Sequence, residues 1–330
     1  MQGFCDDMKL IIKKSDNDGR LALVDRYLDT DWRMEVVDEY DDIAFPRALA
    51  DADAIVSMNW HWSFPALKLK LLHLPGAGVD GIEFDKVPAT VSVCNVYGHD
   101  IGIAEYVMAG ILEFTIGLRA MDRALRQDRW TGSYVCGPRH GELFGQTIGI
   151  VGYGRIGREV ARRARAFGMR VIACSRSAKN PDEFAERVDA MDHFDRLLGE
   201  ADFIVVAAPL TETTHGFINE SAFAKMKTSA VVVNVARGAI IDEPALYQAL
   251  KSKRIAGALI DTWYKYPRQG DDHQKPASLP FHELDNLIMT PHASGWTHNL
   301  TSRRCQSIAD NLNRLARGEA LINVVTQGYT

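Results

Sequence analysis

The stretch that decides the fold is QTIGIVGYGRIG, residues 146–157. It begins with an apolar run typical of a buried strand. Gly152, Gly154 and Gly157 then follow in the spacing G-x-G-x-x-G, and residues 155–167 have the periodicity of a helix. Strand, glycine turn and helix in this order predict a dinucleotide-binding unit. Its pyrophosphate would lie on the free N–H groups at the start of the helix.

Each glycine has its own expected role in such a unit. Gly152 allows the tight turn, Gly154 lets the backbone approach the pyrophosphate, and Gly157 lets the helix pack closely on the strand. A glycine-rich turn in an ordinary α/β protein is the alternative interpretation. The flanking strand and helix favour the nucleotide site.

The composition limits what else the protein can be. With 330 residues, of which 46% are hydrophobic and 25% charged, we expect a globular protein of two domains. The net charge of −5, without a long basic run, argues against nucleic acid or membrane as partners. The acidic N-terminus argues against a signal peptide, and glutamates within the apolar stretch 101–118 indicate a buried helix rather than a membrane span. Five scattered cysteines without C-x-x-C spacing indicate reduced thiols in a cytoplasm and no metal site.

Apolar runs alternating with helical stretches predict doubly wound parallel sheets in an α/β protein. The predicted strands are 8–12, 53–57, 71–74, 91–96, 147–151, 170–174, 203–208, 230–235, 256–260 and 287–290. A long helix is expected at 104–119, a glycine-rich loop at 131–145, and a surface loop with three prolines at 264–282.

Polar residues follow three of the strands predicted in the second half of the chain. They are Arg237, Asp261 and His292. Ligands of open α/β sheets bind outside the carboxyl ends of the strands. There Arg237 can form a forked interaction with a carboxylate, and His292 can exchange a proton near neutral pH. Each residue alone has a structural alternative, a surface salt bridge or a loop position, but the combination favours an active site.

Two segments of the first half have two interpretations each. The glycines of residues 75–80 expose backbone N–H groups to a small anion, or they form a plain turn. In Asn59-Trp60-His61-Trp62, Trp60 either packs in the interior or forms the wall of a substrate pocket.

The chain resembles the D-isomer-specific 2-hydroxyacid dehydrogenase family over nearly its full length. The matching segments are PGAGVD (75–80), IAEY (103–106), GYGRIG (152–157), APLTETT (208–214), MKTSAVVVNVARGAIIDEPAL (226–246), GALID (257–261) and MTPHASGWT (289–297). The resemblance implies a Rossmann cofactor domain at 101–296, inserted in a flavodoxin-like substrate domain made of 1–100 and 297–330. It also implies a site across both domains, and a homodimer formed through the helix near 104–125.

The same resemblance implies hydride transfer between a nicotinamide and C2 of a 2-keto or 2-hydroxy acid. Backbone N–H groups of Ala77 and Gly78 would hold the substrate carboxylate, Arg237 would bind the substrate, and His292 would be the acid/base. Asp261 would accept a hydrogen bond from the nicotinamide carboxamide. The cofactor contacts would be Gly152, Gly154, Arg155, Ile156, Gly157, Pro209, Thr214, Ala236, Asp261, His292 and Ser294.

One position departs from the family pattern. Family members usually carry a glutamate five residues after the aspartate of this strand, where it orients and charges the histidine. Here that position is Tyr266. We predict that Tyr266 is a neutral substitute whose hydroxyl reaches His292, directly or through water. The alternative is a carboxylate from the following loop, namely Asp271, Asp272 or Glu283.

The missing glutamate also leaves other functions open. The related formate dehydrogenases have glutamine at that position, and they share the tryptophan of Asp261-Thr262-Trp263 and the pattern of residues 292–295. A formate-dehydrogenase-like activity is therefore one alternative. Another is a dinucleotide-sensing interaction protein, because the family includes a transcriptional corepressor.

The end of the second strand of the nucleotide unit predicts NADP rather than NAD. NAD-specific folds place an acidic residue about 20 residues beyond the fingerprint, where it binds the ribose hydroxyls. Here the strand runs into Ser175-Arg176-Ser177, and no acid occurs before Asp182. A hydroxyl and a guanidinium suit a 2′-phosphate. The alternative is that Arg176 covers the adenine of NAD.

Overall fold

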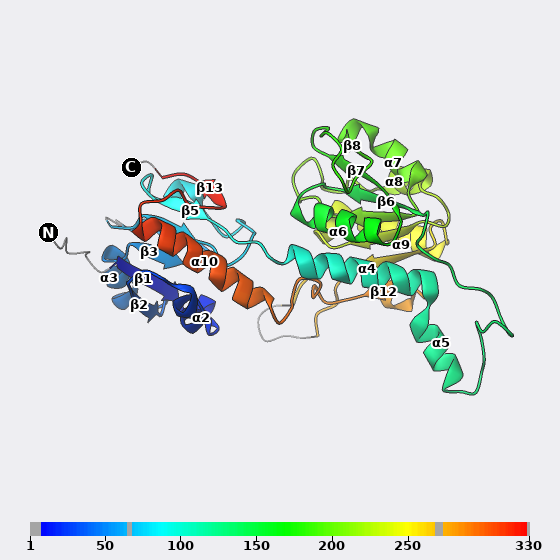
Figure 1. The fold of residues 1–330 in the computed structure, drawn as a ribbon, viewed down its shortest axis with the longest axis horizontal. Coiled ribbons are helices and arrows are strands. Elements are labelled where there is room, and N and C mark those ends of the chain that lie inside the picture. Colours follow the sequence, from blue (N-terminus) through cyan, green and yellow to red (C-terminus); the bar gives the residue numbers. More distant parts are fainter. Residues whose placement is uncertain (1–7, 65–67, 268–272, 329–330) are drawn as a thin grey trace. The chain divides into compact units, whose positions relative to one another are not determined.

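The computed structural model describes residues 8–64, 68–267 and 273–328. The chain folds into two compact α/β units (Figure 1). The first unit consists of residues 1–98 and 297–330, and the second of residues 99–296.

The first unit contains a six-stranded sheet in the order β13-β5-β4-β3-β1-β2. Its strands are β1 (Met8–Lys13), β2 (Trp32–Val37), β3 (Ala54–Val56), β4 (Leu71–His73), β5 (Ser92–Cys94) and β13 (Val324–Thr326). All pairs are parallel except β13, which is antiparallel to β5. The helices are α1 (Lys14–Asn17), α2 (Arg20–Tyr27), α3 (Ala44–Ala50), η1 (Phe84–Lys86) and α10 (Leu300–Ala316).

Successive residues of β1 face opposite sides of this sheet. Leu10 and Ile12 pack in the same core as residues of α2 and α10, whereas Ile11 packs in the core that contains residues of α3. The sheet is therefore covered on both faces.

The second unit contains a seven-stranded parallel sheet in the order β12-β11-β10-β9-β6-β7-β8. Its strands are β6 (Thr147–Val151), β7 (Arg170–Ser175), β8 (Arg187–Ala190), β9 (Phe203–Val206), β10 (Val231–Asn234), β11 (Gly257–Ile260) and β12 (Leu287–Met289). Its helices are α4 (Asp100–Ile116), α5 (Leu118–Leu125), α6 (Arg155–Ala166), η2 (Met191–His193), α7 (Phe194–Glu200), α8 (Glu220–Lys225), η3 (Gly238–Ile240), α9 (Glu243–Lys251) and η4 (Phe281–Glu283). This strand order is that of a Rossmann fold, extended by one strand.

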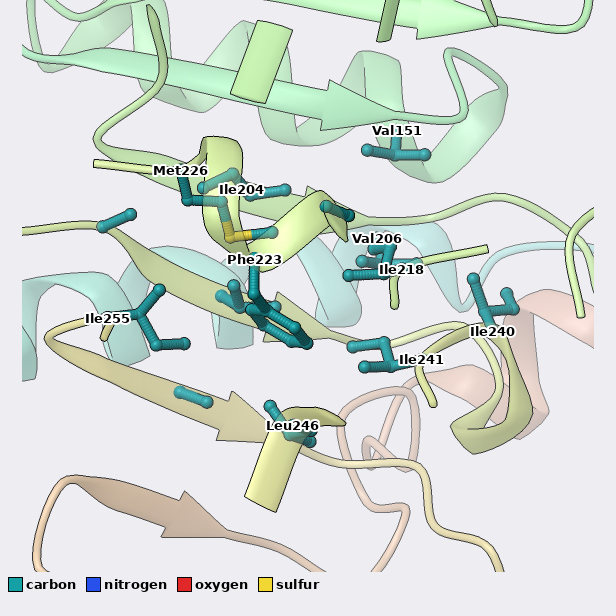
Figure 2. Close-up of a cluster of buried hydrophobic side chains, with 14 of the residues drawn as sticks. Val151, Ile204, Val206, Ile218, Phe223, Met226, Ile240, Ile241, Leu246 and Ile255 are labelled. Atoms are coloured by element: carbon teal, nitrogen blue, oxygen red, sulfur yellow. The ribbon is translucent and has the colours of Figure 1, made fainter. Parts of the chain in front are cut away.

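Two separate cores cover the two faces of this second sheet. The core in Figure 2 includes Val151 of β6 together with Phe223 of α8 and Leu246 of α9. The other core includes Ile150 of β6 and residues of α4 and α6. Neighbouring residues of one strand are thus buried on opposite faces. The doubly wound α/β class predicted from the sequence is confirmed.

Two local predictions need correction. The predicted helix at 104–119 is two helices, because Gly117 adopts a φ of +74° and ends α4. The polar segment 264–282 is only partly a surface loop, because Ala277 and Phe281 are buried in the core. Glu243 holds this part of the segment, where its carboxylate accepts two backbone N–H groups.

No single helix in the described parts of the chain has the length and apolar composition to span a membrane. The bent pair α4–α5 meets these two criteria only when its helices are taken together.

Candidate active site

The glycine turn between β6 and α6 is open to a ligand. Gly152 has a φ of +101°, and a Cβ at this position would lie 2.5 Å from the backbone nitrogen of Ala208. A Cβ on Gly157 would lie 2.3 Å from the carbonyl oxygen of Gly152, so the helix packs directly against the turn. At Gly154, by contrast, no atom lies within 4 Å of the Cβ position, and no side chain caps α6. Uncapped N–H groups beside an open backbone form an anion site that suits a pyrophosphate.

Asp261, at the end of β11, holds the turn that follows β12. The residue is fully buried. Its Oδ1 accepts hydrogen bonds from the Thr290 hydroxyl (2.6 Å) and the Ala293 N–H (2.8 Å), and its Oδ2 accepts one from the Ser294 N–H (2.9 Å). A buried carboxylate needs such donors. Because these donors flank His292, Asp261 sets the position of the histidine.

His292 is exposed at the tip of that turn and has a φ of +57°, which residues with a side chain seldom adopt. Among the described residues, its ring nitrogens have no hydrogen-bond partner. Partial burial lowers the pKa of His292; the carboxylate of Asp261 opposes this effect and the guanidinium of Arg237 adds to it. A lowered pKa favours the neutral imidazole at neutral pH, which is the form that accepts a proton.

Arg237 follows β10 and is also exposed. Its Nη1 donates to the carbonyl oxygen of Ala236 at 2.8 Å, and within the described residues the guanidinium has no other hydrogen-bond acceptor. Asn234 supports this loop: its Nδ2 donates to the Arg237 carbonyl (3.0 Å) and its Oδ1 accepts the Ala236 N–H (3.1 Å). Asn234 is one of the polar residues expected at this strand end, but its supporting role was not predicted.

Tyr266 lies beside His292, with their ring centroids 5.5 Å apart and the ring planes at 54°. Its hydroxyl oxygen accepts the Trp263 N–H at 3.1 Å. The aromatic ring is therefore the part of Tyr266 next to the imidazole, while the hydroxyl binds the backbone. Glu283 forms no hydrogen bond with His292 in the described parts of the chain. Asp271 and Asp272 lie outside the described residues.

In the first unit, the carbonyl groups of the turn after β4 accept hydrogen bonds from residues just after the end of β5. Asn95 Nδ2 donates to the Ala77 carbonyl (2.8 Å), and the Val96 N–H donates to the Gly76 carbonyl (3.3 Å). In the described structure, the N–H groups of Gly76, Ala77 and Gly78 have no protein acceptor. Adjacent free N–H groups can bind an anion. Asn95 is a second supporting residue that the sequence analysis missed.

Of the two interpretations of Trp60, the one that makes it the wall of a substrate pocket was wrong. The side chain is fully buried, and its Nε1 donates to the Lys86 carbonyl at 3.0 Å. Its ring packs edge-on against Trp62, with the centroids 5.7 Å apart. A β-bridge to Ile82 draws this segment into the interior, so the packing interpretation is correct.

Comparison with known proteins gives the family. A family model described as "D-isomer specific 2-hydroxyacid dehydrogenase, NAD binding domain" matches residues 108–294. The chain belongs to this family. A glyoxylate reductase from Korarchaeum cryptofilum is 33% identical over 285 residues, which are 84% of this chain and 83% of that protein. A hydroxypyruvate reductase from Thermotoga maritima is 36% identical over 231 residues, or 69% of this chain and 72% of that protein.

A solved structure agrees. The crystal structure of D-lactate dehydrogenase with NAD+ from Lactobacillus jensenii has a TM-score of 0.77 at 25% identity, and the match covers 97% of this chain and 100% of that one. The protein is therefore a nicotinamide-dependent 2-hydroxyacid dehydrogenase with an NAD-binding Rossmann domain.

Cations follow β7, where the adenosine end of the cofactor is expected. Arg176 and Lys179 follow β7 and are exposed. Lys179 Nζ donates to the Tyr153 carbonyl at 3.1 Å, which holds its ammonium group beside the glycine turn. The Ser175 hydroxyl is not free, because it donates to the Ser177 carbonyl at 2.6 Å.

Asp182, the first acidic residue after β7, already has a cation and hydrogen-bond donors as partners. Asp182 accepts a hydrogen bond from the Tyr153 hydroxyl (2.8 Å), and its Oδ2 lies 3.3 Å from Nη2 of Arg158. These interactions and two backbone N–H groups hold the pKa of Asp182 below its usual value against the opposing effect of burial, which is the largest single influence. Asp182 therefore acts as a structural link between the turn and the segment after β7.

The other expected cofactor contacts surround the glycine turn and the strand ends. Arg155 and Ile156 begin α6. The Thr214 hydroxyl donates to the Pro209 carbonyl at 2.7 Å, which closes the turn after β9. Ala236 is buried behind Arg237. The residues present thus fit a dinucleotide, although both oxygens of Asp261, expected to bind the carboxamide, already accept protein donors.

Proposed function

We propose that this dehydrogenase reduces small 2-keto acids to D-2-hydroxy acids, with Arg237 binding the substrate and His292 as the acid/base. One observation carries the proposal. An exposed guanidinium and an exposed imidazole follow β10 and β12, which flank β11, at the edge where parallel sheets bind ligands. The relatives named glyoxylate reductase and hydroxypyruvate reductase support keto acids of two or three carbons as substrates.

The roles follow from the chemistry of each group. The bound cofactor supplies the hydride that adds to C2. Arg237 binds the substrate carboxylate and polarises the C2 carbonyl. In the first unit, the free N–H groups of Ala77 and Gly78 suit a carboxylate as well. His292, as imidazolium, gives a proton to the resulting alkoxide, and in the reverse direction it takes that proton back. Tyr266, as a neutral neighbour, favours the imidazolium less than a glutamate would.

The test is the cofactor absorbance during turnover of glyoxylate, hydroxypyruvate and formate. We expect Arg237→Ala to lower kcat/KM for the keto acids by about 10- to 100-fold, the worth of a lost charge-assisted hydrogen bond. Cofactor affinity should stay within about twofold of wild type, and Arg165→Ala, an exposed arginine of α6, is the matched control. Unchanged turnover in Arg237→Ala would refute its role.

The same assay distinguishes the proposed function from the two alternative functions. Turnover of formate alone would favour the formate-dehydrogenase-like alternative. Tight cofactor binding without turnover of any of these acids would favour the dinucleotide sensor.

We also propose that the preferred cofactor is NADP. The exposed cations Arg176 and Lys179, with Asp182 neutralised by Arg158, support this choice because a 2′-phosphate needs positive partners. We expect a higher kcat/KM with NADPH than with NADH, and loss of that preference in Arg176→Ala. A wild-type preference for NADH would refute the proposal. A preference that survives the substitution would assign it to Lys179 or Ser177.

A homodimer formed through α4, α5 and the following loop is the third proposal. Figure 1 shows that α5 and this loop stand away from the sheet of their own unit. Their large apolar side chains are exposed: Leu118 by 61%, Leu125 by 52% and Trp130 by 67%. A second copy of this chain is the occupant we propose for this surface. Sedimentation should give a dimer for wild type and a monomer for Leu125→Glu.

A cytoplasmic location is proposed from the cysteines. Cys94, Cys136, Cys174 and Cys305 carry free thiols, which suit a reducing compartment. Fractionation of the cells that produce the protein would test this.

A further inference from the structure

Three arginines gather at one end of the first unit. Arg20 begins α2, which follows β1, and Arg303 and Arg304 lie in the first two turns of α10. The two helices pack against each other, and both contribute to the core on the same face of the sheet (Figure 1). They run in the same direction, because Asn313 near the end of α10 donates to the carbonyl of Tyr27 at the end of α2. The arginines thus lie at the N-terminal ends of two neighbouring helices.

Two guanidinium nitrogens in this cluster are buried without a partner. They are the Nε atoms of Arg20 and Arg304. Within the described residues, the Arg304 guanidinium forms no ion pair or hydrogen bond. Burial lowers the pKa of Arg304, and the charges of Arg20 and Arg303 lower it further. Partly buried cations that repel one another cost free energy unless an anion joins them.

The side chain of Asp16, whose backbone carbonyl binds Arg20, has other partners. Asp16 accepts the Met58 N–H (3.0 Å), and its Oδ2 lies 3.5 Å from Lys13 Nζ. Glu39 also pairs with Lys13, at 3.8 Å. Arg20 binds the backbone carbonyl of Asp16 and, in the described structure, no carboxylate. The charge of the three arginines is therefore not balanced from within the described part of the unit.

The cluster is linked to the turn after β4, whose free N–H groups were described above. Arg20 binds the carbonyl of Asp16, and the carboxylate of Asp16 accepts the Met58 N–H. The sulfur of Met58 lies 3.2 Å from the position that a Cβ on Gly76 would occupy. On the other side, Arg303 donates to the Gly98 carbonyl through Nε (3.1 Å) and Nη2 (2.8 Å), close to where Val96 binds the Gly76 carbonyl. Both anion-binding features thus lie at the carboxyl edge of one sheet.

We propose that Arg20, Arg303 and Arg304 form a binding site for an oxyanion, a phosphate or a carboxylate. Guanidinium groups bind such anions through forked hydrogen bonds, and the N-terminal ends of α2 and α10 add positive potential. The oxyanion has two potential sources. It is either the distal anionic group of a 2-keto acid whose own carboxylate binds the turn after β4, or a separate inorganic anion. The first source rests on the proposed function.

Inorganic phosphate, titrated by calorimetry at constant ionic strength, tests the site without relying on activity. The variants are Arg304→Gln and Arg20→Gln, and the control is Arg26→Gln, an exposed arginine of α2. We expect phosphate affinity to fall at least about tenfold in the first two and to stay within about twofold in the control. Comparison with the control variant separates binding at this site from the general effect of phosphate on protein stability. In phosphate-free buffer, Arg304→Gln should melt at or above the wild-type temperature, since it removes an unpaired cation. Equal phosphate binding by wild type and both site variants would overturn the proposal.

The source of the anion follows from steady-state kinetics with two acids, glyoxylate and 2-oxoglutarate. If the distal group of the substrate binds here, kcat/KM for 2-oxoglutarate falls at least about tenfold in Arg304→Gln while that for glyoxylate stays within about twofold. Equal effects on both acids, together with lost phosphate binding, identify a separate anion. If neither acid is turned over, the proposed function fails, but the phosphate titration still decides whether the site exists.

Discussion

Replacing Asp261 by asparagine tests the central support of the candidate active site. The carboxylate is fully buried and accepts three hydrogen bonds, two of them from the N–H groups of Ala293 and Ser294. In Asp261→Asn one oxygen becomes an NH2 group, which cannot accept, so a buried donor loses its partner. The expected cost is about 1–3 kcal/mol. For a unit of this size, about 2 kcal/mol lowers Tm by roughly 4–8 °C.

The same substitution should change the acid/base behaviour of His292. The negative charge of Asp261 raises the pKa of the imidazole against the lowering effects of burial and of Arg237. Without that charge the imidazolium becomes rarer. We therefore expect keto-acid reduction to fall off at lower pH than in wild type. The positive φ of His292 is also less firmly held, so kcat should fall as well.

Calorimetry and the pH profile of kcat/KM measure both effects. The control is Asp285→Asn, an exposed residue paired with Lys253, whose stability should stay within about 0.5 kcal/mol of wild type. If Asp261→Asn melts like the control and keeps the wild-type pH profile, Asp261 does not hold the histidine turn.

Three further outcomes are expected. Burial lowers the pKa of His73 from 6.5 to about 4, so the unfolded chain binds more protons between these values. The free energy of unfolding is therefore unaffected by this group above pH 6.5 and falls by about 3 kcal/mol as the pH drops to 4. Denaturant titrations at several pH values should find a smaller fall in His73→Gln than in wild type. Tyr266→Glu restores a carboxylate beside His292 and should move the pH at which reduction falls off upward by about one unit; an unchanged profile would separate Tyr266 from the reacting imidazole. In Gly157→Ala the new Cβ meets the Gly152 carbonyl at 2.3 Å, so NADPH affinity, measured by fluorescence, should fall about tenfold or more.

Local patterns in the sequence were enough to predict most of the fold. The strand β6 and the helix α6 lie where the fingerprint predicts them, because a parallel strand buried on both faces needs an unbroken apolar run. The edge strand β2 was missed, since it alternates with Arg33 and Glu35 and is only partly buried. The short edge strands β8 and β13 were missed as well.

The candidate site was likewise predicted only in part from the sequence. Chain order alone predicts Arg237, Asp261 and His292 at strand ends, because each follows a short apolar run typical of a buried strand. The partner of each side chain was decided by the tertiary structure. Asp261 binds the turn after β12 because β11 and β12 are neighbours in the sheet, and the Tyr266 hydroxyl binds the Trp263 N–H rather than His292. Likewise, the arginines of α2 and α10 are far apart in the sequence and meet only because both helices pack on one face of the first sheet, so spacing along the chain carries no signal for them.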